Sequence, residues 1–170
     1  MLAALLALVL AAPPALTCPK GAERRGDAPP DGFEQWCEAP DAYGHSRRHG
    51  PARTWYDDGA PWVEQSFADG IVDGPFLERH RNGRPAREGT YVRGRKVGRW
   101  RVWFESGVLE EESEWQDGVA HGRFAAYFPS GALRTEGRHC GGAQCGRWRT
   151  FGEDGKEAGA VEYGEQRLVP

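Results

Sequence analysis

The 170-residue sequence lacks a surplus of positive charge, because 25 Asp and Glu residues outnumber 22 Lys and Arg residues. Proteins that bind nucleic acids usually carry a basic surplus, so we expect no nucleic-acid partner. After residue 12 no apolar run is long enough to span a membrane. The sequence also lacks a serine elbow and a glycine-rich phosphate loop that opens a helix. These absences predict a protein that is not an enzyme and uses no cofactor.

The composition also lacks the signs of a disordered chain, which is normally poor in aromatic residues. Here seven Trp, seven Phe and five Tyr accompany 24 Gly and 12 Pro. Abundant glycine together with abundant aromatic residues is typical of proteins made of many short strands and tight turns.

Residues 1–17 are interpreted as a signal peptide. The first twelve are almost wholly Leu, Ala and Val, and two prolines follow. Such a run is short for a membrane span and is typical of a signal-peptide core. Cleavage is expected after Ala12, Ala15 or Thr17. Because no Lys or Arg precedes the run, an N-terminal strand or a buried helix stays open as an alternative.

Beyond this segment the sequence repeats itself every 24 residues. The first of three recurring glycines occupies Gly50, Gly74, Gly98, Gly122 and Gly146. A second glycine follows nine residues later, after a turn-forming residue such as Asp58 or Asn82, and a third follows eleven residues further on in the first four units. Glycine tolerates the positive φ of hairpin turns, so each unit is predicted to be strand, turn, strand, turn. Residues 50–170 hold five repeats, and residues 18–49 form an N-terminal cap with half a repeat.

The segments between the turns alternate in side-chain character. In residues 99–104, Trp100 and Phe104 fall on one face and Arg99 and Arg101 on the other. Residues 24 positions apart form columns, and rings fill three columns of the first face. The columns are Phe76, Trp100, Phe124 and Trp148; Tyr56, Phe104 and Phe128; and Phe67, Tyr91, Trp115, His139 and Tyr163. We predict an all-β fold, a single-layer antiparallel β-meander of tandem 24-residue hairpin repeats that stack on one another.

The pairing of charges predicts the strand register. With four residues in the turn, Arg53 faces Glu64 and Arg101 faces Glu112, and such opposed charges contribute about 0.2–1 kcal/mol each. The same register places Gly89, Ser113 and Gly137 opposite Phe76, Trp100 and Phe124. The alternative is that these glutamates are simply solvated.

The four cysteines are expected to form two disulfides, because an even number in an exported protein is typical of an oxidising compartment. Cys140 and Cys145 flank a predicted four-residue turn, which places them opposite each other. Cys18 and Cys37 then remain as the second pair, which would pin the cap to the first strand. We predict a secreted or periplasmic protein.

Two other roles for these cysteines are disfavoured. A lipid on Cys18 would make an outer-membrane lipoprotein, but Thr17 replaces the small residue that usually precedes the acceptor. His139, Cys140 and Cys145 supply only three candidate zinc ligands, and a disulfide is the better interpretation of the two cysteines. No metal is expected.

Two surface features are candidate binding sites. Trp55, Trp103, Tyr127 and Phe151 form a column on the face opposite the three aromatic columns, and the candidate arginines of that face are Arg99, Arg101, Arg123 and Arg147. Arginine and aromatic residues dominate interface hot spots, so this stripe predicts a binding surface. The alternative is that the rings only cover the second face, with the arginine stems packed over them. His45 and His49, beside Arg47 and Arg48, predict either an anion-binding loop or a solvated one.

The spacing resembles that of MORN repeats. Residues 67–74 and 115–122 carry the pattern of an aromatic residue, two residues, Gly, three residues and Gly. The spacing is more similar to the bacterial MORN variant found in YwqK-type antitoxin-like proteins, and the resemblance covers about residues 32–164. The resemblance implies a scaffold that binds protein partners or phospholipids.

We therefore expect an exported repeat scaffold that binds a protein or another component of the cell envelope. A module that binds phospholipid headgroups or glycans is the first alternative. An antitoxin or immunity protein is the second.

Overall fold

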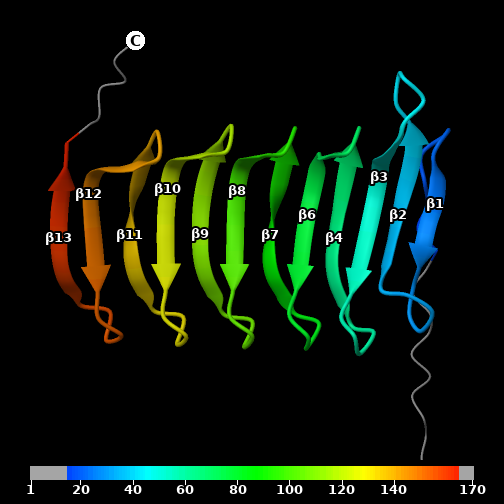
Figure 1. Ribbon diagram of the computed structural model, residues 1–170. Helices are drawn as coiled ribbons and strands as arrows, with labels where there is room; N and C mark the ends of the chain where they lie inside the picture. Colours follow the sequence, from blue (N-terminus) through cyan, green and yellow to red (C-terminus); the bar gives the residue numbers. More distant parts are fainter. Residues whose placement is uncertain (1–14, 165–170) are drawn as a thin grey trace, which may run out of the picture.

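The computed structural model describes residues 15–164, so the apolar N-terminal run, cleavage after Ala12 and the last six residues lie outside the described chain. The described residues form 13 strands and no helix. Twelve strands lie side by side in chain order within one antiparallel sheet, and the short β5 pairs only with β4 (Figure 1). The strands are β1 (Glu23–Asp27), β2 (Glu34–Pro40), β3 (Ser46–Trp55), β4 (Pro61–Ala68), β5 (Ile71–Val72), β6 (Gly74–Arg79), β7 (Pro85–Val92), β8 (Arg95–Trp103), β9 (Leu109–Gln116), β10 (Val119–Tyr127), β11 (Leu133–Cys140), β12 (Ala143–Phe151) and β13 (Glu157–Tyr163).

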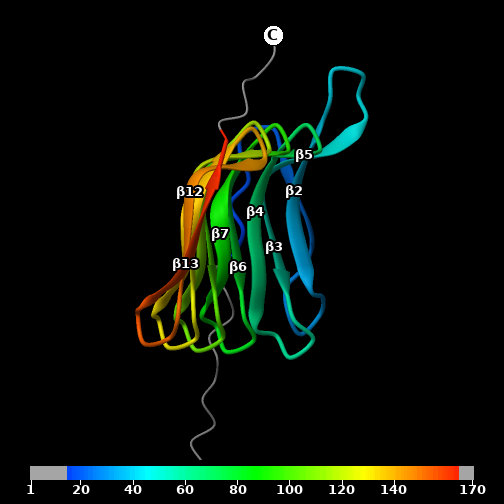
Figure 2. The ribbon, with the colours of Figure 1, turned by 90° about the vertical axis from the view of Figure 1, so that its left-hand side faces the viewer.

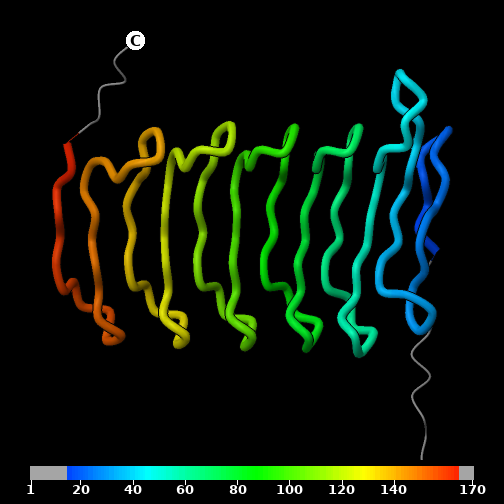
Figure 3. The backbone as a smooth tube through the Cα atoms, viewed as in Figure 1, coloured from blue at the N-terminus to red at the C-terminus, as the bar shows by residue number. Residues whose placement is uncertain are grey.

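The sheet is a single layer, as Figure 2 shows from the end of the row. The chain runs up and down without crossing over, and the backbone path in Figure 3 repeats with each hairpin. The all-β meander that the sequence predicts is therefore confirmed. Within residues 15–164 no helical segment offers a membrane span.

The turns along one edge of the sheet contain only two residues. Both residues have positive φ, which is 51° at Asp69 and 84° at Gly70, and the equivalent residues of the later units agree. This is the geometry of a type I′ turn, which matches the twist of paired strands. The N–H of the turn glycine donates to a carbonyl 22 residues earlier, as from Gly94 to Val72 at 2.8 Å. Each turn is therefore bonded to the preceding unit.

This turn geometry corrects one expectation. The sequence predicts a four-residue turn with Cys140 opposite Cys145, whereas the structure pairs Cys140 with Ala143 because the turn consists of Gly141 and Gly142 alone. The predicted disulfide is nevertheless present and joins the two strands diagonally, with Cα atoms 5.8 Å apart. Residues 140, 143 and 145 share one face, which makes the diagonal bond possible.

Replacing Arg93 by Asn should stabilise the fold by about 0.5 kcal/mol, because Asn tolerates positive φ better than Arg. Arg93 has a φ of 49° at the position that Asp69 and Asp117 occupy in other units. Urea unfolding followed by circular dichroism measures the change. The reverse substitution, Asp117→Arg, should destabilise by a similar amount. A loss of stability in Arg93→Asn would contradict this account of the turn.

The opposite edge carries a bulge in every unit. Thr54 pairs with Val63 but Trp55 pairs with Pro61, so Trp62 is an extra residue on its strand. The equivalent extra residues are Ala86, Glu110, Arg134 and Ala158. A bulge increases the local twist and ends regular pairing. The first strand of each unit, namely β3, β6, β8, β10 or β12, therefore ends at the same column of the repeat.

One face of the sheet, called the aromatic face, carries the packed rings of Phe76, Trp100, Phe124 and Trp148. Trp100 is only 2% exposed, and its ring centroid lies 5.7 Å from that of Phe76 and 4.8 Å from that of Tyr91. Phe76 stands opposite Gly89 as predicted, and a Cβ on Gly89 would overlap the Trp100 ring. Glycine is needed there because the indole occupies the space of a side chain.

Two residues other than Phe, Tyr and Trp complete this packing. The Lys96 ammonium lies 4.4 Å from the Trp100 ring centroid and 4.6 Å from that of Trp115, so it contacts both rings. Burial lowers the pKa of Lys96, and the nearby Arg87 lowers it further. The His139 ring packs edge-on at 5.0 Å from Trp148, and burial lowers its pKa. His139 therefore acts as a ring within its column.

The predicted charge pairs are confirmed. Arg53 faces Glu64 with a nitrogen–oxygen distance of 3.6 Å, and Arg101 faces Glu112 at 2.9 Å. These glutamates are therefore paired across strands rather than only solvated.

The segment before β1 covers the start of the array. The predicted disulfide between Cys18 and Cys37 is present, with Cα atoms 5.5 Å apart. Leu16 and Cys37 are buried at 6% and 1% exposure. A Cβ on Gly50 would lie 2.6 Å from Pro19 Cδ, which shows how closely this segment approaches β3.

Candidate binding face

The second face of the sheet, called the charged face, carries the arginines at positions 99, 101, 123, 147 and 149. The aromatic residues that the sequence assigns to it end successive strands. Trp103, Tyr127 and Phe151 are the last residues of β8, β10 and β12, and all three are partly buried. The Arg149 guanidinium lies 5.4 Å from the Phe151 ring centroid, so these two side chains share the face.

Trp55 does not belong to the accessible part of this column, which corrects the sequence-based assignment. Its side chain is 5% exposed, although it also ends its strand, β3. The backbone N–H of Trp55 donates to the carbonyl of Phe33 at 2.9 Å, so the residue before β2 pairs with the end of β3. The ring that ends β3 is thus buried, whereas the rings that end β8, β10 and β12 are partly exposed.

The arginines and the aromatic column form two separate rows. Arg99 and Trp103 are four residues apart on β8, which is about 13 Å along a strand. Arg101 lies between them, and its guanidinium donates to Glu112 and Glu88, both at 2.9 Å. Those hydrogen bonds raise the pKa of Arg101. Arg101 therefore ties β8 to both neighbouring strands, and its first role is structural.

The charged face is apolar near its N-terminal end. Pro51 and Pro75 occupy the column that holds arginine in the last three units. Together with Leu77 they line an open depression of about 380 Å³ over β3, β4 and β6. The polar residues that line this depression are Arg53, Glu64, Gln65 and Ser66.

The C-terminal end is basic instead. A second open depression of about 430 Å³ lies over β10, β11 and β12, and its charged lining residues are Arg123, Glu136, Arg138, Arg147 and Arg149. Arg149 is paired with Glu136, and Arg147 lies 3.3 Å from Glu157. Arg123 and Arg147 belong to the predicted stripe, whereas Arg138 and Arg149 do not. Arg138 could have been found from the register, because it shares a column with Glu114 and Glu162.

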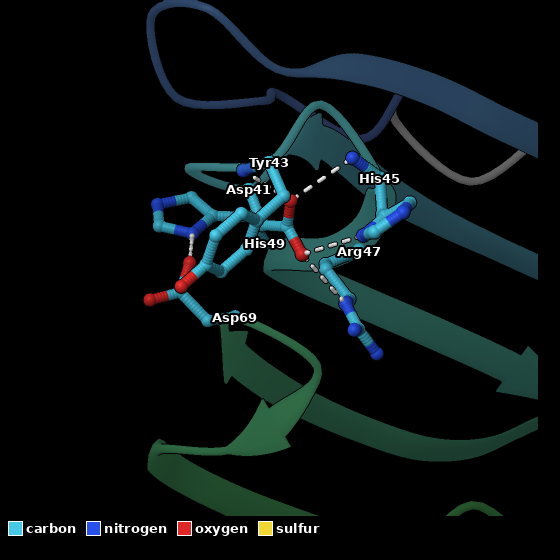
Figure 4. Close-up of polar contacts among 6 residues, drawn as sticks. All are labelled: Asp41, Tyr43, His45, Arg47, His49 and Asp69. Atoms are coloured by element: carbon cyan, nitrogen blue, oxygen red, sulfur yellow. Dashed lines mark hydrogen bonds and ion pairs between the residues drawn. The ribbon is translucent and has the colours of Figure 1, made fainter.

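The turn between β2 and β3 projects beyond the other turns of its edge (Figure 1). Its conformation depends on Asp41, whose Oδ1 accepts the backbone N–H groups of Tyr43 and His45, both at 2.9 Å (Figure 4). Arg47 donates to Oδ2 of the same carboxylate at 3.2 Å. Burial raises the pKa of Asp41, but these hydrogen bonds and the Arg47 charge outweigh it and lower the pKa.

The remaining basic residues of this turn also have partners within the chain. His49 Nδ1 lies 3.4 Å from an Asp69 carboxylate oxygen. Arg48 lies 2.7 Å from Glu34 and 4.9 Å from the Trp36 ring centroid. These pairings favour a structured turn over an anion-binding loop. Among residues 15–164 no cluster of His, Cys, Asp and Glu is arranged to hold a metal ion.

One open sheet of tandem hairpins places the chain among the β-repeat proteins. Residues 96–117, which span most of β8 and β9, match the family model described as MORN repeat variant. This match supports the MORN-type repeat that the glycine and aromatic spacing predicts. The finer likeness to YwqK-type proteins remains a prediction. No curated protein matches the chain.

Proposed function

We propose that this protein is an exported, non-enzymatic scaffold whose charged face binds a protein or another component of the cell envelope. MORN repeats support a role in binding or scaffolding. The observation that carries the proposal is the row of partly exposed rings on the open sheet, at Trp103, Tyr127 and Phe151, with arginines on the same face. A rigid sheet presents such residues at little entropic cost, and they dominate interface hot spots.

The two disulfides support export, because they are compatible with an oxidising compartment outside the cytoplasm. The burial of Leu16 favours cleavage before that residue, since the cap would otherwise lose a packed side chain. The arginines of the charged face also support a second candidate function, the binding of phospholipid headgroups or glycans. Nothing in the arrangement of these residues favours an antitoxin role over a scaffold.

Replacing Trp103 and Arg99 together by Ala should weaken binding to the envelope partner by at least about tenfold, because a ring anchor and a charge on one face are lost. The wild-type and variant proteins are compared for retention of a solubilised envelope fraction, of purified cell-wall fragments and of phosphatidylglycerol liposomes. Arg101 is left intact because it holds neighbouring strands together.

The matched control is Tyr43→Ala, which removes an 87% exposed aromatic residue outside the charged face. It should leave retention unchanged, and circular dichroism should show that both variants keep the sheet. Equal retention by the wild type and the Trp103/Arg99 variant would mean that the rings serve only to cover the sheet.

A further inference from the structure

Within the described strands, the charged face contains one cross-strand pair of like charge. Arg123 on β10 stands directly opposite Arg138 on β11. The equivalent pairs in the flanking units are complementary, namely Arg99 with Glu114 and Arg147 with Glu162. Like charges directly opposite each other destabilise a sheet by up to about 1 kcal/mol. The array therefore departs from its own charge pattern at one place.

Neither guanidinium of this pair forms an ion pair with a carboxylate of residues 15–164, whereas those of Arg147 and Arg149 do. Glu114 is beside Arg123, but its Oε2 accepts the backbone N–H of Arg123 at 2.8 Å. Arg147, which contacts Glu157 at 3.3 Å, adds a third guanidinium to the same 430 Å³ depression.

We propose that Arg123, Arg138 and Arg147 form a binding site for a polyvalent oxyanion group, the chemistry shared by phosphate and sulfate esters. Guanidinium groups bind such oxygens through paired, charge-assisted hydrogen bonds. An anion between Arg123 and Arg138 replaces their repulsion by two attractions. The bound group thus supplies a negative charge next to the position that Glu114 and Glu162 occupy in the flanking units.

The surroundings favour a discrete anionic group over a broad anionic surface. Glu136 and Glu157 lie next to the arginines, and Glu162 faces Arg147. The whole chain has a formal net charge of −3. An extended negative surface would therefore meet carboxylates around the site, whereas a single group can enter the depression. This inference deepens the proposed binding role of the charged face, but its test needs no macromolecular partner.

Titration of the full protein with inorganic pyrophosphate at low ionic strength, followed by isothermal calorimetry, tests the site. The wild type should bind one equivalent saturably. Arg138→Glu, which restores the complementary pairing of the flanking units, should weaken binding by at least about tenfold. Arg24→Glu in β1 makes the same change of net charge at an exposed position and should leave the affinity unchanged.

Thermal unfolding gives a second readout that does not depend on binding. Without anion, Arg138→Glu should raise Tm by roughly 2 °C, because an attraction replaces a repulsion. Pyrophosphate should raise the Tm of the wild type and leave that of Arg138→Glu unchanged. A lower Tm in Arg138→Glu without anion would show that the Arg123–Arg138 pair is not strained.

Phosphatidylcholine vesicles that carry phosphatidic acid identify the source of the group. If the wild type binds these vesicles and Arg138→Glu does not, the site is assigned to a lipid phosphate. If the wild type binds only pyrophosphate, the site is assigned to a soluble ligand. Absence of saturable pyrophosphate binding, or an equal loss in Arg138→Glu and Arg24→Glu, would overturn the proposal. If the wild type bound no pyrophosphate but still retained the envelope partner, the anion site would be wrong and the scaffold role would remain supported.

Discussion

Trp100→Ala should lower the free energy of unfolding by about 3–5 kcal/mol, which is the usual cost of deleting a buried Trp side chain. Trp100 is 2% exposed and contacts the rings of Phe76 and Tyr91 in the middle of the array. In a repeat protein each unit is stabilised mainly by its neighbours. We therefore expect the single unfolding transition to split into two, which urea titration monitored by fluorescence and circular dichroism would detect.

A matched pair of milder variants separates ring packing from hydrogen bonding. The indole Nε1 of Trp148 donates to the Arg138 carbonyl at 3.0 Å, whereas the buried Nε1 of Trp100 has no partner within residues 15–164. Trp148→Phe should therefore cost about 1 kcal/mol more than Trp100→Phe. If Trp100→Phe were the more damaging of the two, hydrogen bonding of the indole would not explain the difference between these two core positions.

Replacing Cys18 and Cys37 together by Ala should destabilise the protein by about 3 kcal/mol, because their bond closes a loop with a sequence separation of 19. The loss should fall on the cap, where Leu16 and Cys37 are buried. Hydrogen exchange should therefore become faster in β1 and β2 before it changes in β8 to β10. Chemical denaturation with and without reductant measures the total effect.

The second disulfide provides the control. Cys140 and Cys145 have a sequence separation of only 5, so their replacement by Ala should cost less, about 2 kcal/mol by the same loop-entropy argument. Exchange should then increase in β11 and β12 and not in the cap. An equal or larger loss from the Cys140–Cys145 variant would contradict the loop-length explanation.

Much of the fold could be predicted by comparing residues that lie 24 positions apart in the sequence. The 24-residue period, the pairing of Phe76 with Gly89 and the pairing of Arg101 with Glu112 all follow from alternation and register. The length of the turns could not be predicted in this way. An Asp-Gly or Gly-Gly pair fits more than one loop length, and in the structure each two-residue turn is also bonded to the preceding unit.

The candidate site was predictable only in part. Arg123 and Arg147 share a column of the sequence, and Arg138 follows from the same register once the strands are paired. The burial of Trp55 could not be predicted, because its equivalents Trp103, Tyr127 and Phe151 are only partly buried. Arg101 likewise belongs to the predicted binding stripe, whereas its guanidinium is bonded to Glu88 and Glu112.

Periodic spacing along the chain is enough to define the repeat, the two faces and the register of the two strands within a unit. Which side chains remain available for binding depends instead on packing in three dimensions. The packing of an irregular segment such as the cap depends on its shape and not on the repeat period. The carboxylate with which an arginine pairs depends on the distances between neighbouring strands. As a result, Trp103, Tyr127 and the Arg123–Arg138 pair are accessible on the charged face, whereas Trp55 is buried.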